Sequence, residues 1–390
     1  MFHIKTYNKI SAKGLSEFPT DFYQVSESEE HPIGIVLRSQ KLHDIELPES
    51  VMAIARAGAG TNNIPIEKCT QKGIVVFNTP GANANAVKEL VLAGLLLGSR
   101  GIVQGRDFVN SLGDDMDSDA MSKLLEKEKK QFAGSEVQNK TLGIVGLGAI
   151  GSLVADAALA LGMKVVGYDP ALSVESAWRL SARVQRMESL EQLLGKVDFL
   201  SLHVPAIPAT LNLINEDNLK LMKSRAVILN FARGAIVDSK AVLNTLNSNS
   251  LGQYICDFPE PWLIGHDRVI AVPHIGASTA EAEENCATMA VNQLREFLEH
   301  GNIKNSVNFP PTDMPRTQSG GRLTFSNLNQ PGVLGEVLSL MAENDINIID
   351  MVNKSRDDIA YNILDLSEEP SSEVINKLKD MESILTIRLI

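Results

Sequence analysis

Two side chains in the second half of the sequence are of the types that an alcohol oxidation needs. His274 lies in segment 273–279, and Arg233 lies in segment 230–234. Removal of hydride from a secondary alcohol leaves a proton on its hydroxyl group, and an imidazole accepts a proton near neutral pH. A guanidinium can hold a substrate carboxylate with two hydrogen bonds and polarise the neighbouring carbonyl. We therefore take His274 as a candidate acid/base and Arg233 as a candidate substrate-binding residue.

A carboxylate that orients and charges His274 can come from segment 256–261. This segment contains Asp257 and Glu260. Either carboxylate would stabilise an imidazolium that forms when His274 takes a proton. The residues alone leave both assignments open.

A dinucleotide site is predicted by three glycines, Gly146, Gly148 and Gly151. They follow an apolar strand at 141–145 and precede a helix that runs from Ser152. In such a turn the first glycine allows the tight bend, the second lets the backbone approach a pyrophosphate, and the third permits close packing of the helix. The N-terminus of that helix then presents free N–H groups to the phosphates.

The residue that ends the next predicted strand indicates which dinucleotide binds. Asp169 follows the glycines by about 20 residues, where a carboxylate can accept hydrogen bonds from both ribose hydroxyls. A carboxylate at this place repels a 2′-phosphate, and segment 170–175 contains no Arg or Lys. We therefore predict NAD rather than NADP as cofactor.

These residues must be positioned by alternating strands and helices. Short apolar runs at 33–37, 51–55 and 74–77, followed by a helix at 83–98, indicate a first α/β domain. A polar, charged connection at 113–131 leads to a second domain. Its strands are expected at 141–145, 164–168, 199–203, 226–230, 253–257 and 269–272. Helical segments between most of them predict a doubly wound parallel sheet.

The last part of the chain has a different pattern. An amphipathic helix is expected at 280–299, and the Pro-rich segment 308–321 ends in Gly320 and Gly321 as linkers do. After it, strands at 322–327, 346–354, 359–366 and 384–390 and helices at 332–343 and 371–381 follow in the order β-α-β-β-α-β. This order is typical of a ferredoxin-like domain.

Composition excludes several classes of protein. A chain of 390 residues is longer than one hydrophobic core usually organises, so we expect two or three domains. A net charge of −12 disfavours nucleic-acid binding. No apolar run approaches the roughly 20 residues of a membrane span, and the N-terminus lacks a signal-peptide pattern, so we expect a cytoplasmic protein without membrane contact. Cys69, Cys256 and Cys286 are widely spaced, which predicts buried thiols and neither disulfide nor metal site.

With these motifs in this order, the chain resembles the D-isomer-specific 2-hydroxyacid dehydrogenases. The resemblance covers nearly the whole chain, from segment 56–60 through 78–81 to the His274 segment and the C-terminal domain. It implies that Arg233 binds substrate, that His274 is the acid/base and that Glu260 is its partner. The family usually has two more residues before its Glu-Pro pair, so the loop carrying Glu260 is shorter here. The implied NAD contacts are Thr79, Gly146, Gly148, Ala149, Ile150, Gly151, Asp169, Val204, Ala232, Asp257, His274, Gly276 and Ala277.

The resemblance also implies the domain plan. The expected fold class is α/β, with a flavodoxin-like substrate domain, a Rossmann NAD domain and a ferredoxin-like ACT domain. The expected boundaries are 1–97 and 281–310 for the substrate domain, 98–280 for the NAD domain, 311–321 for the linker and 322–390 for the ACT domain.

The substrate is expected to carry a second anionic group. Arg56 precedes a loop of Gly58, Ala59 and Gly60, whose bare backbone and neighbouring guanidinium suit a phosphate. The resemblance implies oxidation of 3-phospho-D-glycerate to 3-phosphohydroxypyruvate, the first step of L-serine biosynthesis. Glycerate, glyoxylate or 4-phosphoerythronate as substrate, or a non-catalytic NAD-binding partner protein, remain alternatives.

The C-terminal domain carries two candidate effector residues. Segment 327–334 and Asn347 resemble an ACT domain, an amino-acid-sensing module. Asn329 and Asn347 offer both donors and acceptors to an amino acid such as L-serine. A domain that only dimerises through its sheet edges is the other reading. The family implies a homodimer or homotetramer.

Overall fold

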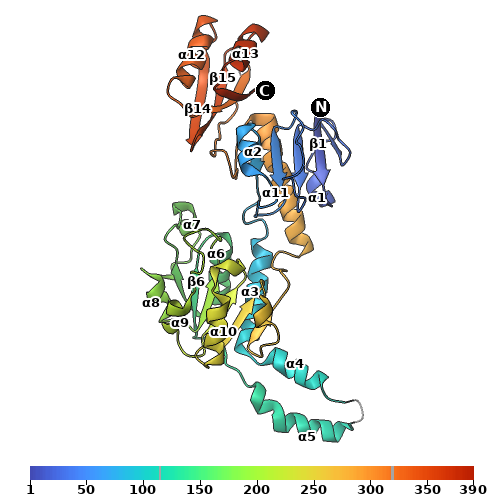
Figure 1. Cartoon of the computed structure of the whole chain (residues 1–390), viewed down its shortest axis with the longest axis vertical. Helices are drawn as coiled ribbons and strands as arrows, with labels where there is room; N and C mark the ends of the chain where they lie inside the picture. The colour runs from blue at the N-terminus through green and yellow to red at the C-terminus, as the bar shows by residue number, and fades with distance from the viewer. Residues whose placement is uncertain (114–115, 318–319) are drawn as a thin grey trace. The chain divides into compact units, whose positions relative to one another are not determined.

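The computed structural model describes residues 1–113, 116–317 and 320–390 (Figure 1). The chain divides into two compact units. One comprises Met1–Asn83 with Ala280–Ile390, and the other comprises Ala84–Thr279. Residues 318 and 319 of the predicted linker lie outside the described residues. Each unit is built on its own sheets and cores.

The first unit begins with a five-stranded parallel sheet. Its strands are β1 (Phe2–Tyr7), β2 (Tyr23–Ser26), β3 (Gly34–Leu37), β4 (Ala53–Arg56) and β5 (Val75–Phe77), in the order β2-β1-β3-β4-β5. This is the flavodoxin-like order that the sequence predicts for the substrate domain. Helices α1 (Ala12–Leu15), α2 (Ile66–Gln71) and α11 (Ala280–His300) belong to the same unit. Helix α11 closes the core through Ala287, Val291 and Leu294.

The second unit is a seven-stranded parallel sheet. Its order, β12-β11-β10-β9-β6-β7-β8, is the Rossmann order extended by one strand. The strands are β6 (Thr141–Val145), β7 (Lys164–Tyr168), β8 (Gln185–Arg186), β9 (Phe199–Leu202), β10 (Val227–Asn230), β11 (Gln253–Cys256) and β12 (Val269–Ala271). The helices between these strands are α6 (Ala149–Ala160), α7 (Val174–Trp178), α8 (Leu190–Leu194), α9 (Glu216–Lys220) and α10 (Ser239–Asn247). Leu142, Ile144, Leu229 and Ile255 are buried in one of its two cores.

Helix α3 (Ala84–Ser99) lies on the other side of the domain boundary from where the sequence predicts it. The sequence places residues up to 97 in the substrate domain, but α3 belongs to the second unit. The reason is its apolar face: Val87, Val91 and Leu95 join the core that contains Leu142 and Ile255. The second unit therefore begins about one helix earlier than expected.

In its described residues, the charged connection between α3 and β6 contains the α-helices α4 (Ile102–Asn110) and α5 (Ser118–Glu128) and the 3₁₀ helix η1 (Lys129–Phe132). The side chain of Asp117 caps α5 by accepting a hydrogen bond of 2.8 Å from the N–H of Ala120. Neither α-helix has a buried residue. The two helices therefore contribute no buried side chain to the core of their own unit.

The C-terminal domain has the predicted ferredoxin-like order. Strands β13 (Arg322–Leu328), β14 (Ile348–Arg356), β15 (Ile359–Leu366) and β16 (Ile384–Leu389) form an antiparallel sheet in the order β14-β15-β13-β16. Helices α12 (Val333–Glu343) and α13 (Ser372–Lys379) pack on it through Val337, Met341 and Val374. Strand β14 is an exposed edge, whereas every residue of β15 is buried.

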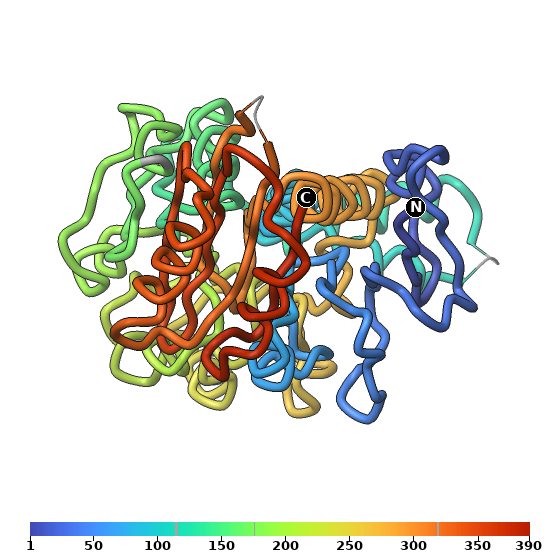
Figure 2. Tube along the Cα trace, turned by 90° about the horizontal axis from the view of Figure 1, so that it is seen from above, coloured from blue at the N-terminus to red at the C-terminus, as the bar shows by residue number. Residues whose placement is uncertain are grey.

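Three strands of this domain hold the C-terminal end of α11. Arg322 of β13 donates a hydrogen bond of 3.0 Å to the carbonyl of His300, and Tyr361 of β15 donates one of 2.8 Å to the carbonyl of Gly301. Arg388 of β16 binds the carbonyl of Phe297 and lies 4.5 Å from that residue's ring centroid. The last carbonyls of a helix have no partner inside it, so Arg322 caps the carbonyl of His300 from outside. Arg388 adds a second bond to the carbonyl of Phe297, which the N–H of Gly301 also binds at 2.9 Å. Figure 2 shows the C-terminus of the chain beside this end of α11.

Arg322 and Asp365 form a buried ion pair in this domain. Two hydrogen bonds of 2.6 and 2.8 Å join the guanidinium to the carboxylate. The remaining Arg322 donors bind the carbonyls of His300, Met314 and Pro315. Burial by itself would raise the pKa of Asp365, but the bonds from Arg322 and Thr317 hold it below its ordinary value. Because both charges are matched, the pair fixes the linker against β13 and β15.

Within the described ranges, no helix combines the length and apolar character needed to cross a membrane.

Candidate active site

The glycine turn has the geometry that its sequence predicts. Gly146 adopts a φ of 91°, and a Cβ there would lie 2.6 Å from the carbonyl oxygen of His203. A Cβ on Gly151 would lie 2.0 Å from the carbonyl oxygen of Gly146. A Cβ on Gly148 would meet nothing within 4 Å. Two glycines are therefore needed for packing, while the middle one leaves open space beside the N-terminus of α6.

Asp169 is tied to this turn. Its Oδ2 accepts a hydrogen bond of 2.8 Å from the N–H of Leu147, and its Oδ1 accepts one of 2.9 Å from the N–H of Ala171. These bonds place a carboxylate at the carboxyl end of β7, next to the carboxyl end of β6. An acidic group at this edge is the partner that a ribose requires.

The other predicted residues of this unit follow the neighbouring strands. Val204 follows β9, Ala232 and Arg233 follow β10, Asp257 follows β11, and His274 follows β12. Since these strands are parallel neighbours, their carboxyl ends lie at one edge of the sheet. The structure therefore brings the predicted catalytic and cofactor residues of this unit to the same edge as the glycine turn.

Asp257 organises the loop that carries His274. Its buried carboxylate accepts hydrogen bonds of 2.7 Å from the N–H of Ile275 and 2.8 Å from the N–H of Gly276. Its carbonyl accepts a bond of 3.1 Å from the N–H of His274. A Cβ on Gly276 would lie 3.0 Å from Oδ2, so a larger residue would press on the carboxylate. Asp257 thus fixes the backbone on both sides of the imidazole.

His274 itself is exposed, and its backbone has a φ of 56°. Left-handed conformations are uncommon for residues other than glycine, and they gather at functional sites. Its ring centroid lies 4.6 Å from that of Phe258, with an angle of 49° between the planes. Among the described residues, none forms a hydrogen bond with the His274 ring. The ring is thus held by an aromatic contact and by its backbone.

Arg233 also lies near the Phe258 ring. Its Cζ is 5.8 Å from the Phe258 ring centroid, and its Nη1 donates a hydrogen bond of 2.7 Å to the carbonyl of Ala232. The buried Asn230 supports the loop from below, because its Nδ2 donates a bond of 2.9 Å to the carbonyl of Arg233. The guanidinium is exposed and can accept a carboxylate.

Glu260 lies at the start of the 3₁₀ turn η3 (Pro261–Leu263). Its carbonyl accepts a bond of 2.9 Å from the N–H of Leu263. In the part of the chain that the structure describes, its carboxylate forms no ion pair with His274. Only two residues separate Asp257 from Glu260, so this loop is short.

His203, to which the sequence assigns no chemistry, lies beneath the glycine turn. Its Nε2 is 2.8 Å from the hydroxyl oxygen of Ser201, and its Nδ1 is buried with no hydrogen-bond partner among the described residues. Burial lowers the pKa of His203 to about 4. The ring is therefore neutral at pH 7 and supports the backbone that Gly146 approaches.

The remaining predicted substrate residues belong to the first unit. Arg56 ends β4, and its Nε donates a hydrogen bond of 3.1 Å to Oδ1 of Asn63. Gly58 has a φ of 155°, and a Cβ on it would lie 2.4 Å from an Arg56 guanidinium nitrogen. The N–H of Thr79 donates a hydrogen bond of 3.1 Å to the carbonyl of Gly58. The side-chain Nδ2 of Asn78 donates a hydrogen bond to the carbonyl of Ala59. The loop 58–60 is thus ordered around the arginine.

Two residues that the sequence did not single out belong to this cluster. The buried Asn63 holds Arg56 and also donates a bond of 2.7 Å to the carbonyl of Gln40. Arg38 follows β3, the neighbour of β4, and pairs with Glu283 at 2.7 Å. A cation directly after a predicted strand at 33–37 is the signal that could have found Arg38. Asn63 carries no such signal, because only its position below Arg56 gives it a role.

The two candidate effector residues do not meet within one chain. Asn329 lies beside the turn between β14 and β15, where its Nδ2 donates a bond of 3.0 Å to the carbonyl of Asp357. Asn347 lies at the other end of these strands, where its N–H binds Ser367. Strand β15 has eight residues, which separates the two by roughly 25 Å.

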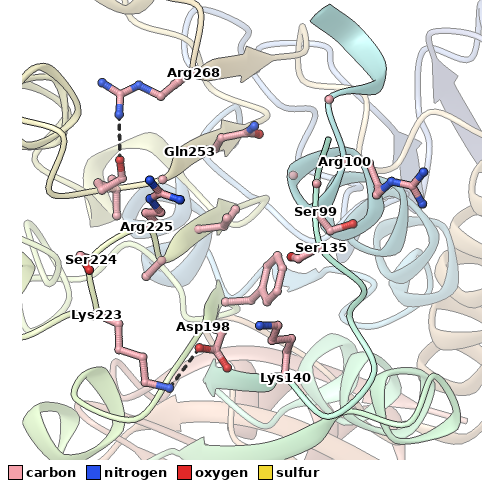
Figure 3. A pocket seen from close by; sticks show the side chains of 18 of the residues that line it. Ser99, Arg100, Ser135, Lys140, Asp198, Lys223, Ser224, Arg225, Gln253 and Arg268 are labelled. Atoms are coloured by element: carbon pink, nitrogen blue, oxygen red, sulfur yellow. Dashed lines mark hydrogen bonds and ion pairs between the residues drawn. The ribbon is translucent and has the colours of Figure 1, made fainter. Parts of the chain in front are cut away.

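A polar cavity of about 750 Å³ lies at the opposite, amino-terminal end of the Rossmann strands (Figure 3). Lys223 pairs with Asp198 at 3.0 Å there, and Arg268 binds the carbonyls of Leu246 and Leu251. These two cations therefore bind a carboxylate and backbone carbonyls and so stabilise the fold. The cavity contains none of the predicted site residues.

Comparisons with known proteins agree with these features. The family described as "D-isomer specific 2-hydroxyacid dehydrogenase, NAD binding domain" matches residues 106–276, and the ACT domain family matches residues 321–383. D-3-phosphoglycerate dehydrogenase of Haemophilus influenzae is 33% identical over 373 residues, which are 92% of this chain and 86% of that protein. The Escherichia coli K12 enzyme of the same name is 31% identical over 410 residues, covering 100% of this chain and 95% of that protein. An NAD⁺-bound 3-phosphoglycerate dehydrogenase structure from Entamoeba histolytica matches with a TM-score of 0.61 and 27% identity, covering 79% of this chain and 98% of that one.

Proposed function

Because the chain belongs to the D-isomer-specific 2-hydroxyacid dehydrogenase family, we propose that it oxidises 3-phospho-D-glycerate to 3-phosphohydroxypyruvate with NAD, the first step of L-serine biosynthesis. One observation carries the proposal. A single edge of the Rossmann sheet presents the glycine turn, Asp169, Arg233 and His274 together. That set provides a dinucleotide site, an anion-binding cation and a proton acceptor.

The residues around the turn fit a dinucleotide. Open space beside Gly148 would receive the diphosphate, and the first N–H groups of α6 would face it. Asp169 would bind the ribose hydroxyls. Ala149, Ile150, Val204, Ala232 and Ala277 are the other residues of this unit that we expect to touch the cofactor. When bound, NAD accepts the hydride.

Two residues would act on the substrate. Arg233 would hold the carboxylate and draw electron density from the carbonyl that forms at C2. His274 would take the hydroxyl proton in the oxidation direction and return it in the reduction direction. Both side chains are exposed, so no packing has to break for either of them to reach a ligand.

Glu260 and Asp257 would have different tasks. Both oxygens of Asp257 are engaged by backbone N–H groups, so this residue is suited to hold the loop. We keep Glu260 as the carboxylate that would pair with His274 once the imidazole is protonated. Its carboxylate forms no ion pair or hydrogen bond with the residues that the structure describes, and this supports the assignment.

The phosphate of the substrate would bind at the loop of Gly58, Ala59 and Gly60 with Arg56. The order of this loop supports the assignment, since Asn63 already fixes the guanidinium. Fixing a side chain before binding lowers the entropy that binding costs.

A substrate panel tests the proposal. The enzyme is assayed with NAD and 3-phosphoglycerate, D-glycerate or 4-phosphoerythronate, and in the reverse direction with NADH and glyoxylate. We expect the highest kcat/KM with 3-phosphoglycerate, and we expect Arg56→Gln to reduce it at least about tenfold while D-glycerate turnover stays unchanged. Arg183→Gln, an exposed arginine of the other unit, is the matched control. Preference for an unphosphorylated acid would contradict the substrate, and no turnover of any acid would favour a non-catalytic NAD-binding protein.

Regulation and assembly are separate parts of the proposal. Because Asn329 and Asn347 lie at opposite ends of β15, an amino acid that contacts both would bind between two copies of the ACT domain, whose edge strand β14 is exposed. Calorimetry with L-serine tests this, since no heat at millimolar serine would reject it. We also expect a homodimer or homotetramer, to be measured by light scattering, and a cytoplasmic location.

A further inference from the structure

The Phe258 ring makes a ring contact with His274 and a cation–π contact with Arg233. Its ring centroid is 4.6 Å from that of His274 and 5.8 Å from Cζ of Arg233. Arg233 follows β10 and His274 follows β12, so two different loops converge on one aromatic ring. The ring therefore sets the spacing between two side chains that no hydrogen bond joins.

The ring is held in place by its own backbone. Asp257, directly before it, is buried and binds the carbonyl of Asn230 through its N–H at 3.1 Å. Pro259, directly after it, restricts the chain. A Cβ added to Gly234 would lie 3.3 Å from the Cβ of Phe258, so the loop after β10 passes close to the phenylalanine. Phe258 has little freedom to move away from its two neighbours.

The short loop between Asp257 and Glu260 carries the aromatic ring that lies beside the imidazole. Two residues separate Asp257 from Glu260, and among the described residues the Glu260 carboxylate forms neither a hydrogen bond nor an ion pair with the imidazole. The face of an aromatic ring carries negative charge, so it attracts the Arg233 guanidinium and also suits an imidazole that becomes protonated. The ring offers both neighbours a favourable contact without competing for their hydrogen-bonding groups.

We propose that Phe258 is a positioning residue that fixes Arg233 and His274 relative to each other for the hydride-transfer reaction. This assignment rests on the proposed function. It acts through contact with the two side chains, and it needs neither a charge nor a proton on Phe258.

The test compares Phe258→Leu, which removes the ring and keeps apolar volume, with Phe258→Tyr, which keeps the ring. Trp262→Leu is the matched control, because this exposed aromatic lies in the same loop and contacts Lys240 instead. For each full-length variant, kcat and KM for 3-phosphoglycerate are measured, together with NADH binding by fluorescence. The ring-proton resonances of His274, in histidine-labelled enzyme without substrate, report the contact directly and are assigned with His274→Asn.

We expect Phe258→Leu to lower kcat/KM about ten- to fiftyfold, with a higher KM as well as a lower kcat, because both neighbours lose their support. NADH affinity should stay within about twofold, and Phe258→Tyr should restore most of the loss. The His274 resonances should lose the ring-current shift in the leucine variant and keep it in the tyrosine variant. A purely structural loss would lower kcat through the folded fraction and leave KM unchanged.

The proposal is overturned if Phe258→Leu keeps kcat and KM, or if the His274 resonances do not differ between the two variants. A wild-type enzyme that oxidises no hydroxy acid would contradict the proposed function instead. The resonances need no turnover, so these two failures can be told apart.

Discussion

The N–H of Leu147, inside the glycine turn, donates a hydrogen bond of 2.8 Å to the carboxylate of Asp169 at the end of the neighbouring strand. The bond joins the part of the site that would face phosphates to the part that would face a ribose. A negative charge is thus fixed where a 2′-phosphate would have to lie.

Asp169→Ser should therefore relax the choice between cofactors. We expect the ratio of kcat/KM with NAD to that with NADP to fall at least about tenfold, because the repulsion is lost. Steady-state kinetics with both nucleotides measure the ratio. Asp156→Ser, at an exposed position of α6, should leave it unchanged. An unchanged ratio in the Asp169 variant would show that selectivity lies elsewhere.

His274→Ala should remove proton transfer and leave the cofactor site intact. General acid/base assistance contributes about 10²- to 10⁴-fold, so we expect kcat to fall by that factor. NADH binding, followed by fluorescence, should remain. His31→Ala, an exposed histidine of the first unit, is the control. Wild-type turnover without the imidazole would exclude His274 from the mechanism.

Arg233→Lys tests the fork geometry of the guanidinium. A lysine keeps the charge but cannot form two parallel bonds to a carboxylate, so we expect kcat/KM to fall about 10²-fold or more. Arg186→Lys, on an exposed ion pair of the same unit, should have no effect. If lysine restored full activity, charge alone would be sufficient.

Asp365→Asn should destabilise the ACT domain and its contact with α11. Removal of one partner from a buried pair typically costs about 3–5 kcal/mol, whereas Glu373→Gln breaks an exposed pair and should change the stability little. Thermal unfolding compares the two variants. Since the pKa of Asp365 is lowered in the folded protein, its stabilising effect is complete above about pH 4 and is lost as the pH falls through that lowered value. Equal melting temperatures for the two variants would contradict this role.

His203 should make the second unit less stable in mild acid. Its pKa is lowered to about 4, while an unfolded histidine titrates near 6.5, so between these values the unfolded chain binds a proton that the folded one does not. Stability should thus fall as the pH drops from about 6.5 to 4. At pH 5 this difference amounts to about 2 kcal/mol. In urea unfolding, His203→Gln should show a smaller loss between pH 7 and pH 5 than the wild type.

Most of the fold could be predicted from local patterns. The glycine turn, the strands 141–145 and 164–168, and the helix 280–299 agree with β6, β7 and α11 to within a residue. Strand β1 was not predicted, because His3 and Lys5 interrupt its apolar pattern and bind the segment around Glu29. The end of the first unit was placed too late, since the sequence of α3 does not show which core its apolar face joins.

The sequence predicts those parts of the site in which the type of a single residue indicates its chemical role. Arg233, Asp257 and His274 follow strands, and this order placed them at one edge. What stayed hidden depends on contacts between loops distant in sequence. Nothing in the residue types distinguishes Phe258 from other phenylalanines until the loops after β10 and β12 approach it.

Because side chains of the last domain bind the C-terminal end of α11, truncated forms of the enzyme would lack these contacts. A fragment that stops at Pro315 would keep every residue proposed for catalysis, yet it would lose Arg322, Tyr361 and Arg388, which complete the helix. Phe297 and Phe309 would then face water instead of Tyr361. An inactive fragment would consequently report an unfinished fold, and regulation by the last domain has to be studied with point variants in the intact chain.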